Sequence, residues 1–264
     1  MIRSTIFTIW FYSFSFLIAM TCWLIAMVST RTVMWYVLKF WGRACVFMVR
    51  LVLGSRIEVR GLEHYDPSRP QLIVSKHQSE LDIVMLGAAF WDVTAIAMAE
   101  LTKLPFFGTI LRTIDAVTIA VDAGPQGRTQ QAIDGAKRVR DSGRTLVVYP
   151  EGELMKLGAK ERYRGGIGHI YTHTEIEVIP VAASLGVIWP QRQWRKFSGV
   201  TGVMELLEPI QPGQDFDTFM ATLEERIETN TMRLIEETAS GQELEDARDR
   251  FRRGANNEVE KAER

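Results

Sequence analysis

The first fifth of this 264-residue chain lacks acidic residues. No Asp or Glu precedes Glu58, and the run from Ser4 to Thr30 carries no charge of either sign. About 20 apolar residues suffice to cross a bilayer as a helix, so this run predicts a transmembrane helix. A cleaved signal peptide is the weaker alternative, because the run is too long and no small-residue cleavage site precedes a polar mature start.

The chain also has few cysteines and almost no net charge. Cys22 and Cys45 are the two cysteines of the chain, and both lie in apolar stretches without a CxxC pattern. We expect them to be buried thiols in a reducing compartment. The formal net charge of −1 argues against nucleic acid as a partner, because phosphate binding relies on a marked basic excess.

Basic residues dominate the region after the apolar run. Five of the six cations that precede Glu58 follow the run, at Arg31, Lys39, Arg43, Arg50 and Arg56. The positive-inside tendency therefore predicts that the rest of the chain is cytoplasmic. Residues 32–53 are apolar apart from three of these cations, which share one helical face. This pattern suits a helix in the headgroup layer or the second arm of a hairpin, and a core helix with solvated cations is the alternative.

Short apolar runs alternate with amphipathic segments beyond Gly54. Strands are expected at residues 56–60, 71–75, 94–99, 116–120, 145–149, 178–182 and 199–207, and helices at 81–90, 126–141, 164–174 and 215–238. This alternation predicts an α/β domain with a mostly parallel sheet flanked by helices. Pro180 lies within one of the runs, which predicts an edge strand or a strand end.

The chain is therefore expected to have three parts. Residues 1–54 would form membrane-anchoring helices, residues 55–239 a catalytic domain, and residues 240–264 a polar charged tail. The tail is mixed in charge and nearly without core residues, which predicts either a frayed helix or a disordered segment.

The segment SKHQSELD places a histidine and a carboxylate at the end of a predicted strand. His77 lies at the junction with a helix, and Asp82 lies one turn into that helix, from where it can reach back to the imidazole. Such a carboxylate fixes the tautomer of the ring and stabilises the imidazolium that forms when histidine takes a proton from an alcohol. The pair predicts general-base catalysis, although Ser79 and Asp82 also fit an ordinary helix start.

Two further segments follow the strand expected at residues 145–149. In VVYPEGELMKLG, Glu151 comes at the carboxyl end of the strand, where open α/β sheets bind ligands, so its carboxylate could orient a hydroxyl group. In KLGAKERYRGG, cations lie beside glycines, which allows close approach to a phosphate or to the phosphopantetheine of an acyl carrier. Solvated loops are the alternative for both segments.

Together these segments resemble the glycerolipid acyltransferase family, which includes the 1-acylglycerol-3-phosphate acyltransferases, from about residue 55 to residue 237. His77 and Asp82 match its H-x4-D motif, KLPFFGTILRTIDAV the region of its second block, YPEG its F-P-E-G block and VIPVAAS its fourth block. The stretches SLGVIWPQRQWRK and AKERYRGGIGHIY are most similar to bacterial members. The resemblance implies direct acyl transfer from acyl-carrier protein or acyl-CoA, with His77 as the base and Glu151 in acceptor binding.

Two positions depart from the pattern of this family. The third block normally continues T-R, but here it continues Glu153 and Leu154, and the second block commonly ends in an acidic residue followed by arginine, but here Ala123 follows Asp122. The family is thought to use those arginines on the phosphate of the acceptor. Other cations would have to replace this charge-assisted pair. The candidate acceptor-binding residues are therefore Glu151, Gly152, Arg112, Lys156 and Arg162.

The expected activity is transfer of a fatty acyl chain to the free hydroxyl of 1-acylglycerol 3-phosphate, which gives phosphatidic acid. The expected partners are the bilayer, the lysolipid acceptor and the thioester donor, on the cytoplasmic side of a bacterial inner membrane. We expect no metal, since HExxH is absent, and no cofactor. Two alternatives stay open: an acyltransferase for a lysolipid without the phosphate monoester, such as a lyso-aminolipid, and a catalytically silent membrane scaffold of the same fold.

Overall fold

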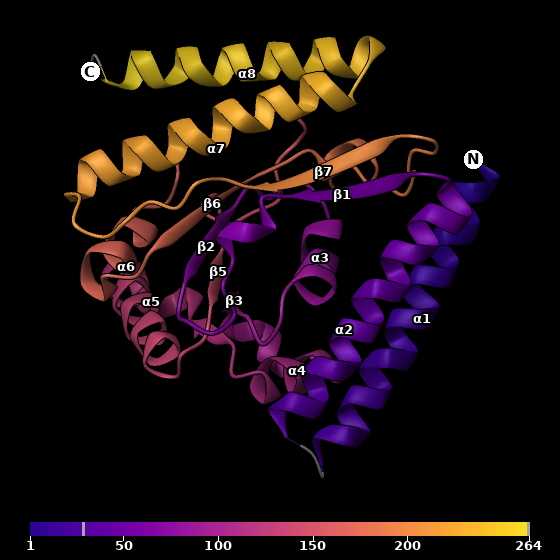
Figure 1. The fold of residues 1–264 in the computed structure, drawn as a ribbon, viewed down its shortest axis with the longest axis horizontal. Coiled ribbons are helices and arrows are strands. Elements are labelled where there is room, and N and C mark those ends of the chain that lie inside the picture. The colour runs from indigo at the N-terminus through magenta and orange to yellow at the C-terminus, as the bar shows by residue number, and fades with distance from the viewer. Residues whose placement is uncertain (28–29, 263–264) are drawn as a thin grey trace.

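The computed structural model describes residues 1–27 and 30–262, with side chains up to residue 254. Its centre is a seven-stranded sheet of order β1-β7-β6-β2-β5-β3-β4 (Figure 1). The strands are β1 (Arg56–Arg60), β2 (Leu72–Ser75), β3 (Thr94–Met98), β4 (Val117–Ile119), β5 (Leu146–Val148), β6 (Val178–Ala183) and β7 (Thr201–Leu206). Among the pairs of strands that the structure describes, β6 and β7 form the one antiparallel pair.

Helices cover both faces of this sheet. They are α1 (Ile2–Ala26), α2 (Arg31–Met48), α3 (Leu81–Ala89), α4 (Phe107–Thr113), α5 (Gly124–Asp141), α6 (Gly166–Thr174), α7 (Phe216–Thr238) and α8 (Gly241–Ala262). Alternate residues of β2 face opposite sides, so Leu72 and Val74 pack with α5, α6 and the first half of α7, whereas Ile73 packs with α1, α2 and α3. Burial on both faces explains the continuous apolar runs of the central strands.

The expected fold class is confirmed, and so are all seven expected strands, with bounds that differ by at most two residues. The helix expected at residues 215–238 begins at Phe216, and Asp215 caps it by accepting hydrogen bonds from the backbone N–H groups of Asp217 and Thr218. The short helix α4 was not among the expected elements.

The expectation from Pro180 is wrong, because this residue lies in the middle of β6, between β2 and β7. The pairing of β6 with β7 begins at Val181, opposite Leu206 at the end of β7. Pro180 lies just outside this ladder, where its carbonyl accepts a hydrogen bond from Leu207 at 2.8 Å. Its missing N–H therefore costs the sheet no ladder hydrogen bond to β7.

The helices α1 and α2 form a hairpin that lies along the domain (Figure 1). Thr8 donates a hydrogen bond to the carbonyl of Trp194 at 3.4 Å, and Phe7 packs edge-on against Trp189 with ring centroids 5.9 Å apart. Further along, α1 packs on α4. The helix expected at residues 32–53 is α2 with a π-helical turn, and it is the second arm of this hairpin.

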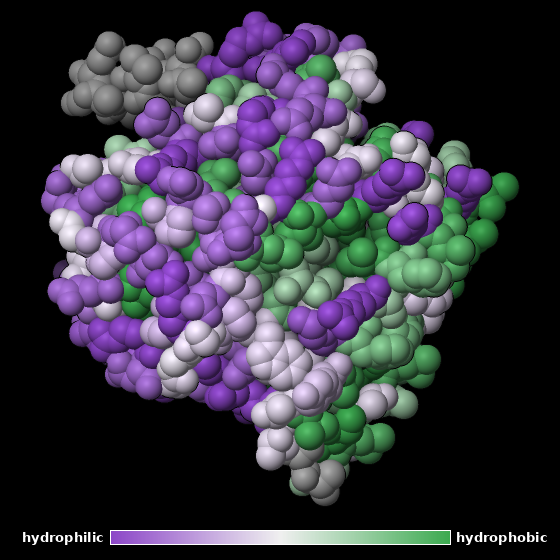
Figure 2. All heavy atoms as spheres, viewed as in Figure 1, coloured by the Kyte–Doolittle hydropathy of each residue, from purple (hydrophilic) through white to green (hydrophobic). Residues whose placement is uncertain are grey.

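The outer side of α1 is apolar. This helix is the one among the described residues that is long and apolar enough to cross a membrane. Figure 2 shows hydrophobic residues gathered along this edge of the molecule. The large apolar side chains exposed there include Ile6, Ile9, Tyr12, Phe16, Leu17 and Leu24. This surface suggests association with a membrane. The expected burial of Cys22 and Cys45 is confirmed. Cys22 packs with residues of α2 and α4, and Cys45 belongs to the main core cluster.

The segment after residue 240 is a helix, α8, which lies alongside α7 (Figure 1). Ala247 is fully buried, and its backbone lies so close to Gly158 that a Cβ there would come within 2.3 Å of the Ala247 carbonyl oxygen. Arg250 donates to the carbonyl of Leu157 at 2.8 Å. Of the two expected forms of this segment, the structure therefore has the helix, and α8 covers the chain that follows β5.

The contact between α2 and α3 holds the hairpin to the domain, and we predict that it depends on Gly42. A Cβ at this position would lie 2.5 Å from the backbone nitrogen of Ala88, so the helices could not keep their distance. Gly42→Leu should cost about 2 kcal/mol through overpacking and lower Tm by about 4 to 8 °C.

Thermal unfolding in detergent, followed by circular dichroism, would measure this effect. Ala44→Leu is the matched control, because Ala44 lies on the side of α2 that lines an open hollow with Phe40 and Phe47. Equal values of Tm for the two variants would contradict the predicted close packing.

Candidate active site

His77 and Asp82 meet at the junction between β2 and α3, as expected from the sequence. Nδ1 of His77 donates to Oδ2 of Asp82 at 2.8 Å, and the same oxygen accepts from the backbone N–H groups of Gln78 and Ser79 at 2.8 and 2.9 Å. Asp82 is fully buried, whereas 14% of the His77 side chain is exposed. Because the carboxylate holds the proton on Nδ1, Nε2 is left as the basic nitrogen of the ring.

The helix-start interpretation of Ser79 and Asp82 is compatible with this pairing. The N–H of Ser79 donates to the carboxylate, and the hydroxyl of Ser79 accepts from the N–H of Leu81 at 3.1 Å. The same carboxylate therefore closes the first turn of α3 and orients the imidazole. It also lies at the end of the helix where a negative charge is favoured.

Tyr149 forms the floor under the imidazole. Its ring stacks on that of His77 with centroids 4.0 Å apart and planes 21° apart. The hydroxyl is buried and has no hydrogen-bond partner among the described residues. Burial raises the pKa of Tyr149 well above its ordinary value, and the nearby carboxylates of Asp82 and Glu151 raise it further. A neutral ring thus restricts the tilt of His77 without adding charge to the site.

Glu151 lies at the carboxyl end of β5, but its carboxylate points into the protein. Its side chain is 0% exposed, and Oε1 lies 3.2 Å from Nζ of Lys76, the residue before His77. The ammonium group of Lys76 also contacts the carboxylate of Glu228 on α7 at 2.7 Å. The expected contact of Glu151 with an acceptor stays a prediction, since this carboxylate faces Lys76.

Arg164 lies against the P-E-G turn. Its Nε donates to the carbonyl of Glu151 at 3.1 Å, and its guanidinium covers Gly152. A Cβ on Gly152 would lie 2.4 Å from Nε of Arg164, and the residue also has φ of +72°. The positive φ favours glycine here, and its absent side chain leaves room for the guanidinium group beside the turn.

The remaining expected acceptor-binding residues lie on two different elements. Lys156 and Arg162 are exposed in the segment between β5 and α6, which also holds Glu151. Arg112 lies on α4, where it donates to the carbonyl of Thr102 at 2.6 Å and lines a hollow of about 800 Å³ with Trp23 of α1. Lys156 and Arg162 thus share a segment with the P-E-G turn, whereas Arg112 belongs to a separate hollow.

Sequence reasoning missed Lys76 and Tyr149 as members of the site, whereas Arg164 was expected as one of the cations of KLGAKERYRGG that could approach a phosphate. The signal for Tyr149 was the pairing of β2 with β5, in which Val74 lies opposite Val148 and both chains leave the sheet at one level. Without the strand order this proximity cannot be inferred. Lysine is rarely buried, so nothing local marked Lys76.

Comparison with known proteins gives a consistent result. Residues 56–184 match the Acyltransferase family. A 1-acyl-sn-glycerol-3-phosphate acyltransferase of Pseudomonas aeruginosa is 30% identical over 169 residues, which cover 64% of this chain and 65% of that protein. A 1-acyl-sn-glycerol-3-phosphate acyltransferase of Helicobacter pylori is 28% identical over 161 residues, which cover 60% of this chain and 67% of that protein.

More distant relatives agree. The human 1-acyl-sn-glycerol-3-phosphate acyltransferase alpha is 27% identical over 173 residues, and the match spans 59% of its length. The chain thus matches less than two thirds of the length of both the Pseudomonas and the human relative. The crystal structure of a 1-acyl-sn-glycerophosphate acyltransferase from Thermotoga maritima has the same fold, with a TM-score of 0.73, 22% identity, and coverage of 88% of this chain and 96% of that one. Residues 56–184 therefore match the Acyltransferase family, and the chain is similar to proteins named 1-acyl-sn-glycerol-3-phosphate acyltransferase.

Proposed function

We propose that this protein transfers a fatty acyl chain from acyl-carrier protein or acyl-CoA to the free hydroxyl of 1-acylglycerol 3-phosphate. The observation that carries the proposal is the geometry of His77, whose Nδ1 is held by a buried carboxylate at 2.8 Å while the ring remains partly exposed. An imidazole held in this way is suited to take a proton from an alcohol. The names of the relatives supply the alcohol and the acyl group.

The reaction needs one base and no covalent intermediate on the protein. Nε2 of His77 takes the proton of the acceptor hydroxyl, whose oxygen attacks the carbonyl carbon of the thioester. The carbon–sulfur bond then breaks, and the thiolate that leaves takes the proton from the imidazolium to become a thiol. Asp82 stabilises that imidazolium, and Tyr149 limits the tilt of the ring.

Arg164 is the cation best placed to bind the phosphate of the acceptor. It contacts Glu151 and Gly152, so it lies beside the turn at which the resembled family carries the arginine that Leu154 replaces here. A guanidinium group binds phosphate through two parallel hydrogen bonds. Lys156 and Arg162 of the same segment would add positive charge around the phosphate, and Arg112 would act from α4.

The protein would work at the cytoplasmic face of a bacterial inner membrane. The apolar outer side of α1 supports this placement, because the lysolipid and its product both reside in the bilayer. We further propose residues 1–54 as the membrane anchor, residues 55–239 as the catalytic domain and residues 240–264 as a polar end.

Two other functions are distinguished by the same assays. A lyso-aminolipid acyltransferase is suggested by Leu154 and Ala123, which stand where the family has arginine. A silent scaffold would not need the oriented pair of His77 and Asp82.

The first test is turnover by membranes that contain the protein. His77→Ala should abolish acylation of 1-acylglycerol 3-phosphate, and Asp82→Asn should lower kcat by roughly 10²- to 10⁴-fold, because a neutral amide cannot stabilise the imidazolium. Initial rates with acyl-carrier protein thioester and several lysolipids would measure this. If the wild-type protein and His77→Ala acylated nothing, the scaffold would be favoured; acylation of another lysolipid alone would favour the lyso-aminolipid enzyme.

The second test concerns the phosphate. Arg164→Gln should raise KM for 1-acylglycerol 3-phosphate by about 10-fold or more, through the loss of a charge-assisted pair, and change kcat little. Arg226→Gln is the matched control, since Arg226 is a cation of α7 that donates to the carbonyl of Glu208. An unchanged KM in Arg164→Gln would remove Arg164 from the acceptor site.

A further inference from the structure

Lys76 places an ammonium group inside the protein, one residue before His77. Its side chain is 0% exposed, and Nζ has three oxygen partners. These are Oε1 of Glu228 at 2.7 Å, the carbonyl of Ala159 at 2.9 Å and Oε1 of Glu151 at 3.2 Å. A buried charge with this many partners is costly to assemble and to disrupt.

The cluster holds two carboxylates and one ammonium. Burial would lower the pKa of Lys76, but the charges of Glu228 and Glu151 outweigh it, and its pKa is raised. Burial raises the pKa of Glu151, against the opposing effect of Lys76. Tyr163 donates to the Oε1 of Glu228 that also contacts Lys76, at 2.7 Å. The ammonium therefore stays charged and is the one cation between two buried carboxylates among the described residues.

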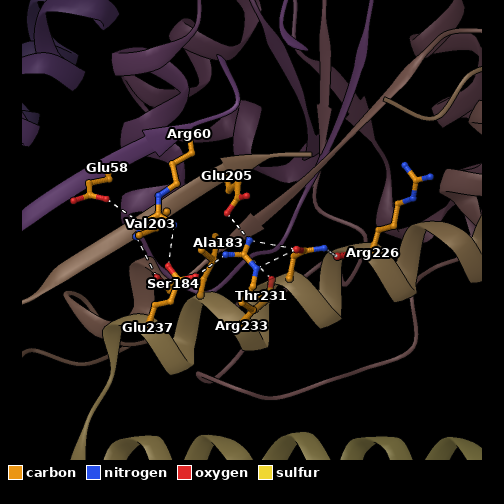
Figure 3. A network of polar contacts seen from close by, with 12 residues as sticks. Glu58, Arg60, Ala183, Ser184, Val203, Glu205, Arg226, Thr231, Arg233 and Glu237 are labelled. Carbon is orange, nitrogen blue, oxygen red and sulfur yellow. Dashed lines mark hydrogen bonds and ion pairs between the residues drawn. The ribbon is translucent and has the colours of Figure 1, made fainter. Parts of the chain in front are cut away.

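This cluster joins three separate parts of the chain. Lys76 follows β2, Glu151 and Ala159 lie in the segment between β5 and α6, and Glu228 lies on α7. Figure 3 shows how α7 is fixed in turn: one turn beyond Glu228, Arg233 pairs with Glu205 of β7 at 2.6 Å. Glu228 is thus held against Lys76 by a helix that is itself tied to the sheet.

The same two strand ends carry the catalytic stack. His77 follows Lys76 directly, and Tyr149 lies two residues before Glu151. Their rings are 4.0 Å apart, so a small displacement of either strand end would tilt the imidazole relative to Asp82. Misplacement by about 1 Å can cost a reaction ~100-fold in rate.

We propose that Lys76 is a positioning residue, whose ammonium, clamped between Glu151 and Glu228, sets the backbone on both sides of the His77–Tyr149 stack. The proposal rests on the proposed function for the reaction it serves. It also assigns Glu151 a role through Lys76, in place of direct contact with the acceptor.

Kinetics of three variants test this role. Lys76→Met keeps an unbranched side chain one atom shorter but leaves two buried carboxylates without a cation, so kcat should fall by about 10- to 100-fold with KM for the lysolipid nearly unchanged. Adding Glu151→Gln removes one of the two charges and should restore part of kcat. Glu151→Gln alone should leave KM unchanged, because Lys76 keeps Glu228.

Arg144→Met is the matched control. Arg144 is also a buried cation, 3.1 Å from Asp92, but it lies just before β5, at the opposite end of the strand from Tyr149. Arg144→Met should lower Tm by about as much as Lys76→Met does and leave kcat per folded protein unchanged. All rates are measured well below the Tm of each variant, with the folded fraction taken from circular dichroism. If Lys76→Met does not fold, Glu228→Gln serves in its place, since it removes one charge and keeps an oxygen for Tyr163.

A spectroscopic measurement separates this proposal from the proposed function. With labelled histidine, the imidazole resonance of His77, assigned by its absence in His77→Ala, reports the stack on Tyr149. Lys76→Met should shift it, and Arg144→Met should not. If the wild-type protein acylated no lysolipid but Lys76→Met still shifted the His77 resonance, positioning would be supported while the proposed reaction failed.

Three outcomes would overturn the proposal. One is an unshifted His77 resonance with normal kcat in Lys76→Met. Another is a raised KM in Glu151→Gln, together with a double variant that is less active than Lys76→Met alone. This result would make Glu151 an acceptor contact. The third is an equal fall of kcat in Arg144→Met, which would make the effect one of general stability.

Discussion

The parallel pairing of β2 with β5 is the constraint on which the site depends. Because Val74 lies opposite Val148, both chains leave the sheet at one level and bring His77 and Tyr149 into ring contact. A slip of one residue would turn every side chain of a strand to the other face, so the core residues beneath the site fix this register. The apolar packing of the sheet and the polar geometry at its edge therefore have one origin.

Local patterns were sufficient to predict the strands and the pair of His77 and Asp82. Strands buried on both faces read as apolar runs, which the sequence displays without any knowledge of strand order. The histidine and the aspartate are five residues apart in the chain, so their contact is decided by local geometry. The second arm of the hairpin was likewise visible as an apolar run with cations on one face.

Contacts between distant segments were out of reach. Lys76 and Glu228 are 152 residues apart, and a lysine buried by such a partner looks like any surface lysine in the sequence. The prediction from Pro180 was wrong because the cost of a proline in a strand depends on where the neighbouring strand ends. The end of β7 cannot be read from the sequence around Pro180. The helix α8 gains its order from packing on Gly158 and Leu157, although its composition is that of a solvated segment.

The carboxylate of Asp82, which we propose to be catalytic, and the apolar helix α1 are joined by a chain of direct contacts. Asp82 is held by the N–H of Ser79, and the hydroxyl of Ser79 donates to the carbonyl of Trp189 at 2.8 Å. The indole of Trp189 packs edge-on against Phe7 and Phe11 of α1, with centroids 5.9 and 4.8 Å apart. The buried side of α1 thus supports the loop that orients His77, the proposed base, while its apolar outer side would meet lipid under the proposed function. A helix with both tasks must stay docked on the domain, which explains why polar side chains such as Thr8 persist in an otherwise apolar segment.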